Sequence, residues 1–337
     1  MRNFIIMLSF LKKLSVFWGL GQALILGACT AEEPPQAPET LYVEPAKEKV
    51  LMGVYPVMLH DFDLAHNTFK VSFYAWWRSK DKAYVPDKTV EITNALDFHS
   101  KFGTTGKFKD EYFTYIRYYA TVSKEWDMRH FPFDHQQLVV ALEDYADIQK
   151  IIFTPDNDQS ALHSEIKLKG WKILGFHLKD SITTYDTNFG DPSTKKGQYS
   201  RLSFIIDIKR EGIRLFFNYF IGFLVAFFLC TVIYILDPRE IGARTSLSLG
   251  ATFTAIGNKY ILDQVLPFTT SFTLADAIQA ATFGMIIAAV SMIIYTNHLM
   301  KSHPYKSVAL LSQRMGLCAL LVYTLFVCYY LSEAAIS

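Results

Sequence analysis

The sequence predicts a β + α membrane protein in which an exported β-sandwich precedes a bundle of four membrane-spanning helices. Of the 337 residues, 51% are hydrophobic and 19% are charged, a composition too apolar for an ordinary soluble protein. Short β-branched and aromatic runs fill residues 50–210, whereas long apolar runs fill residues 211–337. We therefore expect two domains, the second of them in a membrane.

Residues 1–28 have the pattern of a signal peptide. Basic residues precede an apolar run that ends at Leu26, and small residues follow it. The run Leu26-Gly27-Ala28-Cys29 also resembles a bacterial lipobox, in which Cys29 is acylated; an ordinary signal with a chance cysteine is the alternative. Residues 29–49 contain four prolines among glutamates and alanines, which predicts an extended linker.

The exported region, residues 50–210, is predicted to consist of short strands joined by turns. Alternation is clearest near its end, where Phe204, Ile206 and Ile208 occupy every second position, as in a strand with a buried face. Similar runs occur at 50–60, 68–77, 113–122, 137–142, 171–178 and 201–209. Short strands at this spacing predict a β-sandwich or barrel. No cysteine occurs between residues 30 and 229, so this domain must fold without disulfides.

Four apolar segments are long enough to cross a bilayer: 215–236, 245–266, 274–296 and 308–331. Arginines occur in the connector after the first segment and lysines in the connector after the third, whereas the connector after the second has no charge. By the positive-inside rule, the two basic connectors face the cytoplasm. The sequence therefore predicts a multi-pass membrane protein with its β-domain and its C-terminus outside the cytoplasm.

The second segment is more polar than the other three, and polar residues inside a membrane suggest a functional role. Residues at alternating spacings of four and three share one helical stripe: Ser246, Gly250, Phe253, Gly257, Tyr260 and Gln264. This stripe predicts the wall of a water-filled pore; a helix buried against its own three neighbours is the alternative. One stripe cannot enclose a channel, so the pore requires several identical subunits in a ring.

Other classes of function receive no support from the sequence. The 33 basic and 32 acidic side chains give no electrostatic case for a nucleic-acid partner, and P-loop, dinucleotide-binding and zincin motifs do not occur. No catalytic set of nucleophile, base and orienting group is apparent, so we predict neither an enzyme nor a cofactor. The cluster from His60 to His66 could bind a divalent metal, but a hairpin turn in which Asp63 approaches Arg210 is the favoured interpretation.

A resemblance to a known family rests on residues 126–138. This run, Trp-Asp-Met-Arg-His-Phe-Pro-Phe-Asp-His-Gln-Gln-Leu, resembles the signature loop of pentameric ligand-gated ion channels, the Cys-loop receptor superfamily and its bacterial relatives. Animal receptors bracket this loop with two cysteines, where this sequence has Lys124 and Leu138, so it resembles the bacterial type. The resemblance implies a homopentamer whose second span lines the pore. It also implies membrane lipid, permeant ions and a small-molecule agonist as partners.

The resemblance implies roles for residues at the pore and at the domain junction. Ala243 and Arg244 are similar to the turn before the pore helix of anion-conducting members, which implies an anion-attracting ring of Arg244. An orientation-setting arginine is the alternative, and Glu240 is close enough to supply a competing acidic ring. Phe253 occupies the place of the family's hydrophobic gate. Residues that match the coupling region between the domains are Asp63, Pro132, Asp134, Arg210 and Pro267.

Candidate ligand contacts also follow from the resemblance. Glu143 and Tyr145 resemble a segment that contacts an ammonium group, and a carboxylate with cation–π contact suits a small amine or amino acid bound between subunits. Aromatic residues could complete the site: Trp76 or Trp77, Tyr115 or Tyr118, and Phe189 or Tyr199, of which we take Trp77, Tyr118 and both of the last pair as candidates. Core or strand-pairing positions are the alternative for each.

The predicted function is thus a ligand-gated ion channel. A non-conducting, lipid-anchored receptor or assembly protein with the same fold is the alternative, because a fold alone does not determine function. The family's Trp-x-Pro segment is missing from this sequence between Tyr84 and Thr114, so one part of the usual ligand site has no counterpart here.

Overall fold

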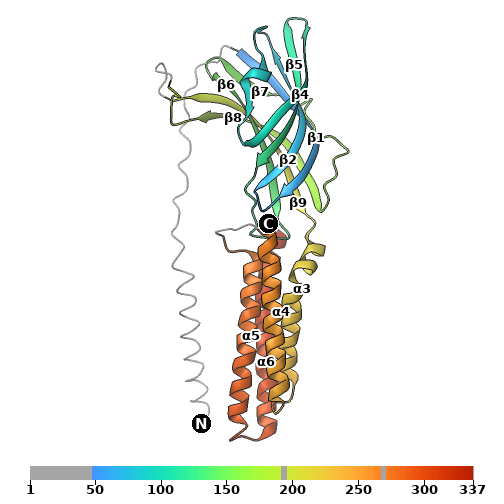
Figure 1. The fold of residues 1–337 in the computed structure, drawn as a ribbon, viewed down its shortest axis with the longest axis vertical. Helices are drawn as coiled ribbons and strands as arrows, with labels where there is room; N and C mark the ends of the chain where they lie inside the picture. The colour runs from blue at the N-terminus through green and yellow to red at the C-terminus, as the bar shows by residue number, and fades with distance from the viewer. Residues whose placement is uncertain (1–47, 191–195, 267–270, 337) are drawn as a thin grey trace. The chain divides into compact units, whose positions relative to one another are not determined.

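The computed structural model describes residues 48–190, 196–266 and 271–336. The predicted signal peptide, Cys29 and Pro267 lie outside the described residues. Within them, a β-domain of strands β1 to β9 comes first and four long helices follow (Figure 1). This is the order of elements predicted from the sequence.

Two sheets form the β-domain. Their strand orders are β4-β5-β2-β1-β7 and β3-β6-β9-β8. Neighbouring strands are antiparallel, except that β1 and β7 are parallel. The strands are β1 Glu48–Asp63, β2 Thr68–Ser79, β3 Val90–Ile92, β4 Ala95–Phe108, β5 Glu111–Ser123, β6 His135–Asp147, β7 Ile151–Pro155, β8 Trp171–Thr184 and β9 Gln198–Arg210. A short helix, α2 Pro86–Thr89, precedes β3.

The two sheets pack face to face through large apolar side chains. Phe73 of β2 and Phe204 of β9 come from different sheets, are fully buried, and have ring centroids 5.0 Å apart. Ile206 and Ile208 are buried on the same face of β9, as their alternation predicts. Burying each such side chain contributes on the order of 1.5–3 kcal/mol. The domain is therefore a β-sandwich, and this part of the fold prediction is confirmed.

All six strands expected from the sequence form, and most are longer than expected. Three strands are not predicted by the sequence: β3 and β7, which are short, and β4. Strand β4 exposes most of its side chains and contains Gly103 and Gly106, so neither composition nor alternation indicates a strand there. A Cβ at position 106 would lie 2.4 Å from the ring of Phe113, so this glycine makes room for an aromatic side chain.

The four long helices are α3 Gly212–Ile235, α4 Ile241–Val265, α5 Leu274–Leu299 and α6 Tyr305–Ile336. They lie side by side as a bundle (Figure 1). Among the described residues, three helical segments have the length and hydropathy to cross a membrane: α3, α5 and most of α6. Helix α4 has a similar length but carries Arg244, Lys259 and Asp263. The fourth membrane span stays a prediction.

Candidate functional site

Helix α4 carries two opposite stripes. The buried stripe faces the other helices and consists of Arg244, Ser248, Ala251, Ala255, Asn258 and Leu262. The predicted pore stripe is displaced from it by two residues, which is about 200° around the helix. Phe253 and Tyr260 in this second stripe are 72% and 67% exposed in the single chain. The stripe predicted to line a pore thus lies on the side of α4 that the other three helices leave uncovered, a side that also includes Leu249 and Ile256.

Arg244 belongs to the buried stripe and is 0% exposed. Its guanidinium donates hydrogen bonds to the carbonyl oxygen of Ile233 at 3.1 Å, to Thr296 Oγ1 at 2.9 Å and to Ser312 Oγ at 3.2 Å. These acceptors come from α3, α5 and α6. The structure contradicts a ring of Arg244 side chains at the pore mouth, because the guanidinium is turned into the bundle. Ala243 beside it is exposed.

Other charged residues lie just before α4. Arg239 donates to both carboxylate oxygens of Asp237 and lies over the ring of Tyr305, 4.2 Å from its centroid. Glu240 is exposed, and within the described residues it has no ion-pair partner. Asp237 and Arg239 pair with one another, so Glu240 is the unpaired member of these three charged residues.

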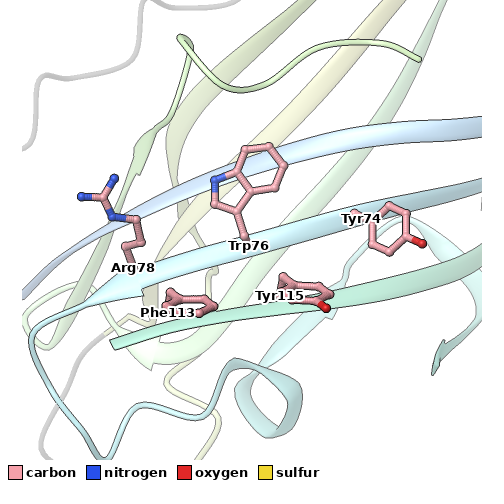
Figure 2. Close-up of a pocket in the computed structure, with 5 residues that line it drawn as sticks. All are labelled: Tyr74, Trp76, Arg78, Phe113 and Tyr115. Atoms are coloured by element: carbon pink, nitrogen blue, oxygen red, sulfur yellow. The ribbon is translucent and has the colours of Figure 1, made fainter. Parts of the chain in front are cut away.

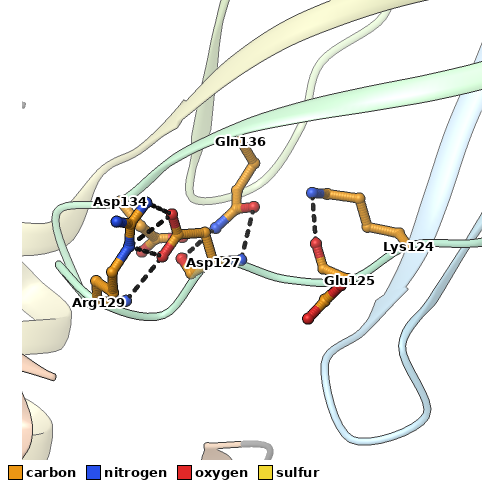
Figure 3. A network of polar contacts seen from close by, with 6 residues as sticks. All are labelled: Lys124, Glu125, Asp127, Arg129, Asp134 and Gln136. Atoms are coloured by element: carbon orange, nitrogen blue, oxygen red, sulfur yellow. Dashed lines mark hydrogen bonds and ion pairs between the residues drawn. The ribbon is translucent and has the colours of Figure 1, made fainter. Parts of the chain in front are cut away.

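The predicted coupling residues Asp134 and Arg210 form a buried ion pair. Arg210 Nε donates to Asp134 Oδ1 at 2.7 Å and Nη2 donates to Oδ2 at 3.1 Å, with the two side chains 8% and 2% exposed. The guanidinium also lies 4.0 Å from the ring centroid of Trp171. Gln136 Nε2 donates to Asp134 Oδ2 and to the carbonyl of Asp127, which ties the carboxylate to the signature loop (Figure 3).

The signature loop directly contacts the helices. Pro132 is buried, and its carbonyl lies so close to Gly212 that a Cβ there would be 2.1 Å from the oxygen. The rings of Phe133 and Phe216 lie 5.9 Å apart. The backbone N–H of Leu274, the first residue of α5, donates to the carbonyl of Arg129 at 2.8 Å. The loop therefore meets the first turns of both α3 and α5.

Asp63 does not share the Asp134 and Arg210 pair. Its carboxylate accepts hydrogen bonds from the backbone and side chain of His66, at 2.9 and 2.8 Å. The hydrogen bond from the His66 backbone N–H is the main cause that lowers the pKa of the Asp63 carboxyl. The predicted approach of Asp63 to Arg210 is therefore wrong. The Asp63 carboxylate is instead bonded to His66, three residues further along the chain. Among the described residues, no group of three metal-binding side chains is present.

The candidate ligand residue Glu143 is buried at 3% exposure and already paired. Its carboxylate accepts from Arg201 Nε at 2.9 Å and from the Tyr185 hydroxyl at 2.8 Å. It therefore positions Arg201 and Tyr185 rather than offering a free oxygen at the surface. Tyr145, two residues on, is 67% exposed.

Three aromatic rings gather at the end of the β8 and β9 hairpin. Tyr185, Phe189 and Tyr199 have ring centroids 5.3 to 6.1 Å apart. Phe189 is 63% exposed and has φ 50°, a left-handed conformation that is uncommon for a bulky side chain. Such conformations are concentrated at binding sites. The cluster places Phe189 and Tyr199 together, as predicted candidates, and adds Tyr185.

Strand β2 places the candidates Trp76 and Trp77 on opposite faces of the sheet. Trp77 and its neighbour on β5, Tyr118, are 1% and 2% exposed and lie in the sandwich core, so the structure removes both from the candidate ligand site. The outward face holds a groove of about 380 Å³, lined by Tyr74, Trp76, Arg78, Phe113 and Tyr115 (Figure 2). Trp76 is fixed there by a 3.0 Å hydrogen bond from Nε1 to Asp156 Oδ2. The parity of the strand is the signal that would have selected Trp76 and Tyr115.

No protein-family model matches the chain. Over 176 residues, or 52% of the chain, it is 24% identical to the gamma-aminobutyric acid receptor subunit beta of Caenorhabditis elegans. The chain is a weak homologue of a Cys-loop receptor subunit. The aligned part covers 30% of that protein's length, and a receptor relative is consistent with a protein that is not an enzyme.

Proposed function

We propose that this chain is a subunit of a homopentameric ligand-gated ion channel and that α4 lines its pore. The uncovered stripe of α4 carries the proposal. A membrane helix exposes serine, glycine and glutamine at low cost only where water or another subunit contacts them. The other three helices pack on the opposite face of α4. A ring of subunits around a water-filled axis would therefore place the polar residues of the stripe in contact with water. The weak homology to a receptor subunit supports the same function.

Phe253 is the proposed gate. Five such side chains, each strongly exposed in the single chain, would form a hydrophobic constriction that closes by excluding water. Reconstituted Phe253→Ala protein in planar bilayers should therefore show a higher basal current than wild type. Ile256→Ala, an exposed residue of α4 outside the stripe, should leave the basal current near the wild-type level. Equal basal currents in all three proteins would refute the gate.

The proposed ligand site lies between two subunits. One subunit contributes the rings of Tyr185, Phe189 and Tyr199, and the next contributes the groove around Trp76. Aromatic faces attract an ammonium group. The groove also contains Arg78, whose guanidinium donates to Glu111 Oε2 at 2.7 Å, so a ligand carboxylate would have to replace that of Glu111. Together they suit a small amine or amino acid. In the proposed setting, a bacterial inner membrane, this site would face away from the cytoplasm.

Neighbouring tryptophans provide a matched test of the ligand site. Glycine and γ-aminobutyric acid are suitable probes, and binding can be followed by the ligand-dependent increase in thermal stability. Trp76→Ala should weaken binding of an active probe at least tenfold. Trp77→Phe should leave the affinity within about twofold of wild type while lowering stability by roughly 1–3 kcal/mol, because it repacks the core. Equal affinity in wild type and Trp76→Ala would exclude the groove.

A further inference from the structure

Asn258 connects α4 to the backbone of α3. Its Nδ2 donates to the carbonyl oxygen of Tyr219 at 2.8 Å, and its Oδ1 accepts from the N–H of Gly222 at 3.0 Å. The side chain is 4% exposed. Both polar ends of one amide are thus satisfied by a single turn of the neighbouring helix, which fixes α4 in both position and rotation relative to α3.

Gly222 makes this contact sterically possible. A Cβ at position 222 would lie 2.6 Å from both Cβ and Oδ1 of Asn258, closer than any two such atoms can approach. The absence of a side chain at position 222 lets the amide reach the α3 backbone. Asn258 and Gly222 are therefore matched in shape as well as in hydrogen bonding.

Hydroxyl side chains in the middle of α4 behave differently. Thr252 Oγ1 donates to the carbonyl of Ser248, and Thr254 Oγ1 donates to the carbonyl of Gly250, so each is satisfied within its own helix. At the beginning of α4, Arg244 holds the helix to all three neighbours. Asn258 lies 14 residues further on, about 21 Å along the axis, and its bonds go to α3 alone.

Tyr219 connects this contact to the β-domain. Its carbonyl accepts from Asn258, while its ring lies 5.8 Å from the ring of Phe131 in the signature loop. Phe131 is 1% exposed and lies under the Arg210 guanidinium, 5.1 Å from it. A displacement of the loop therefore reaches the turn of α3 that Asn258 holds.

We propose that Asn258 is a positioning residue for the pore stripe: through it, α3 sets the placement of the second half of α4. This rests on the proposed channel function. When the signature loop shifts the Tyr219 turn, the Asn258 amide carries the Phe253 to Tyr260 part of the pore stripe with it. The Arg244 end remains fixed by its three neighbours, so α4 tilts about that end.

A double-mutant cycle tests this proposal without a known agonist. All variants are made in the Phe253→Ala background, where a basal current is expected, and open probability is measured from single channels in planar bilayers. Tyr219→Leu removes the ring contact with Phe131 and should change the opening equilibrium constant at least fivefold. In the Asn258→Leu variant, Tyr219→Leu should change the opening equilibrium constant less than twofold, because the Tyr219 turn is no longer hydrogen-bonded to α4. Combined with Thr252→Val, the matched control, the fivefold effect should persist.

Gly222→Ala provides a second route, since its methyl group displaces the Asn258 amide. It should suppress the Tyr219→Leu effect as Asn258→Leu does, and it replaces that variant if Asn258→Leu fails to assemble. An equal effect of Tyr219→Leu with and without Asn258 would overturn the proposal while leaving the channel function intact. Absence of any current from the assembled Phe253→Ala protein would instead refute the proposed function itself.

Discussion

The guanidinium of Arg210 holds both carboxylate oxygens of Asp134 inside the protein, beside the first residue of α3. A buried ion pair costs desolvation energy, and losing one partner leaves the other charge unpaired. Arg210 ends β9 and Asp134 lies in the signature loop just before β6, so this pair fixes the loop to the strand that leads into the helices.

We expect Asp134→Asn and Arg210→Gln each to destabilise the protein by roughly 3–5 kcal/mol. The double variant should lose much less than the sum, because it leaves neither charge unpaired. Unfolding monitored by tryptophan fluorescence in detergent provides the four stabilities of the cycle. Additive losses would show that the pair does not act as a unit.

Gly212 should tolerate no side chain. A Cβ there would meet the Pro132 carbonyl at 2.1 Å, so Gly212→Ala is expected to cost about 1–3 kcal/mol by forcing the loop away from α3. Gly284→Ala in α5 is the matched control, since a Cβ there has no heavy atom within 4 Å. The control should be neutral or slightly stabilising, by up to about 1 kcal/mol. Thermal unfolding of the two variants would refute the contact if both behave alike.

Asp144 gives a pH dependence with a defined sign. Its side chain is 0% exposed, accepts from the Tyr84 and Thr89 hydroxyls, and has a pKa raised mainly by burial. Because the folded pKa lies above the unfolded value, ionisation of Asp144 lowers stability as the pH rises through that interval. The loss of stability caused by ionising Asp144 is complete above the pKa of the folded protein. It is absent below the pKa of the unfolded chain, near 3.8.

The stability of Asp144→Asn relative to wild type should therefore be highest at neutral pH and should decline as the pH falls toward 4. Asp147→Asn, a half-buried neighbour, is the matched aspartate-to-asparagine control. Melting temperatures of the three proteins between pH 4 and pH 8 check the prediction. A gain that grows on acidification would contradict the sign.

Ion selectivity should depend on Glu240 rather than on Arg244. Glu240 is exposed and has no ion-pair partner among the described residues, whereas Arg244 is buried and bonded to neutral acceptors on three helices. Rings of acidic side chains favour cations, so Glu240→Gln should lower the cation-to-anion permeability ratio severalfold. Reversal potentials under a potassium chloride gradient measure this ratio. For Arg244→Gln we expect lower stability and little change in the ratio; the opposite pattern would restore Arg244 to the pore mouth.

Patterns with a clear physical period predicted the fold well. The alternation of Phe204, Ile206 and Ile208 gave β9, and the long apolar runs gave the four helices. The start of α5 also has a local signal, because Thr273 and Asp276 cap each other reciprocally. Strand β4 has no such signal, because it exposes most of its length.

Side-chain partners were harder to predict than elements. A sequence shows that Arg244 follows a turn, but not that acceptors from α3, α5 and α6 converge on it across 11, 52 and 68 residues. Similarly, the sequence does not show that the Asp63 carboxylate bonds to His66 rather than to Arg210. The choice between Trp76 and Trp77 depended on strand parity, which the alternation of Phe73, Ala75 and Trp77 along β2 indicates in the sequence itself.

The most direct test of the central claim compares two serines on α4. Ser246 lies in the exposed stripe and Ser248 in the buried one, 5% exposed. Each is replaced by cysteine in a Phe253→Ala background in which Cys318 and Cys328, the exposed native cysteines of the described residues, are serine. The measurement is the unitary current before and after a charged, membrane-impermeant thiol reagent. We predict that the reagent alters the current of Ser246→Cys and leaves that of Ser248→Cys unchanged. No unitary current, or modification of Ser248→Cys alone, would contradict a pore lined by α4.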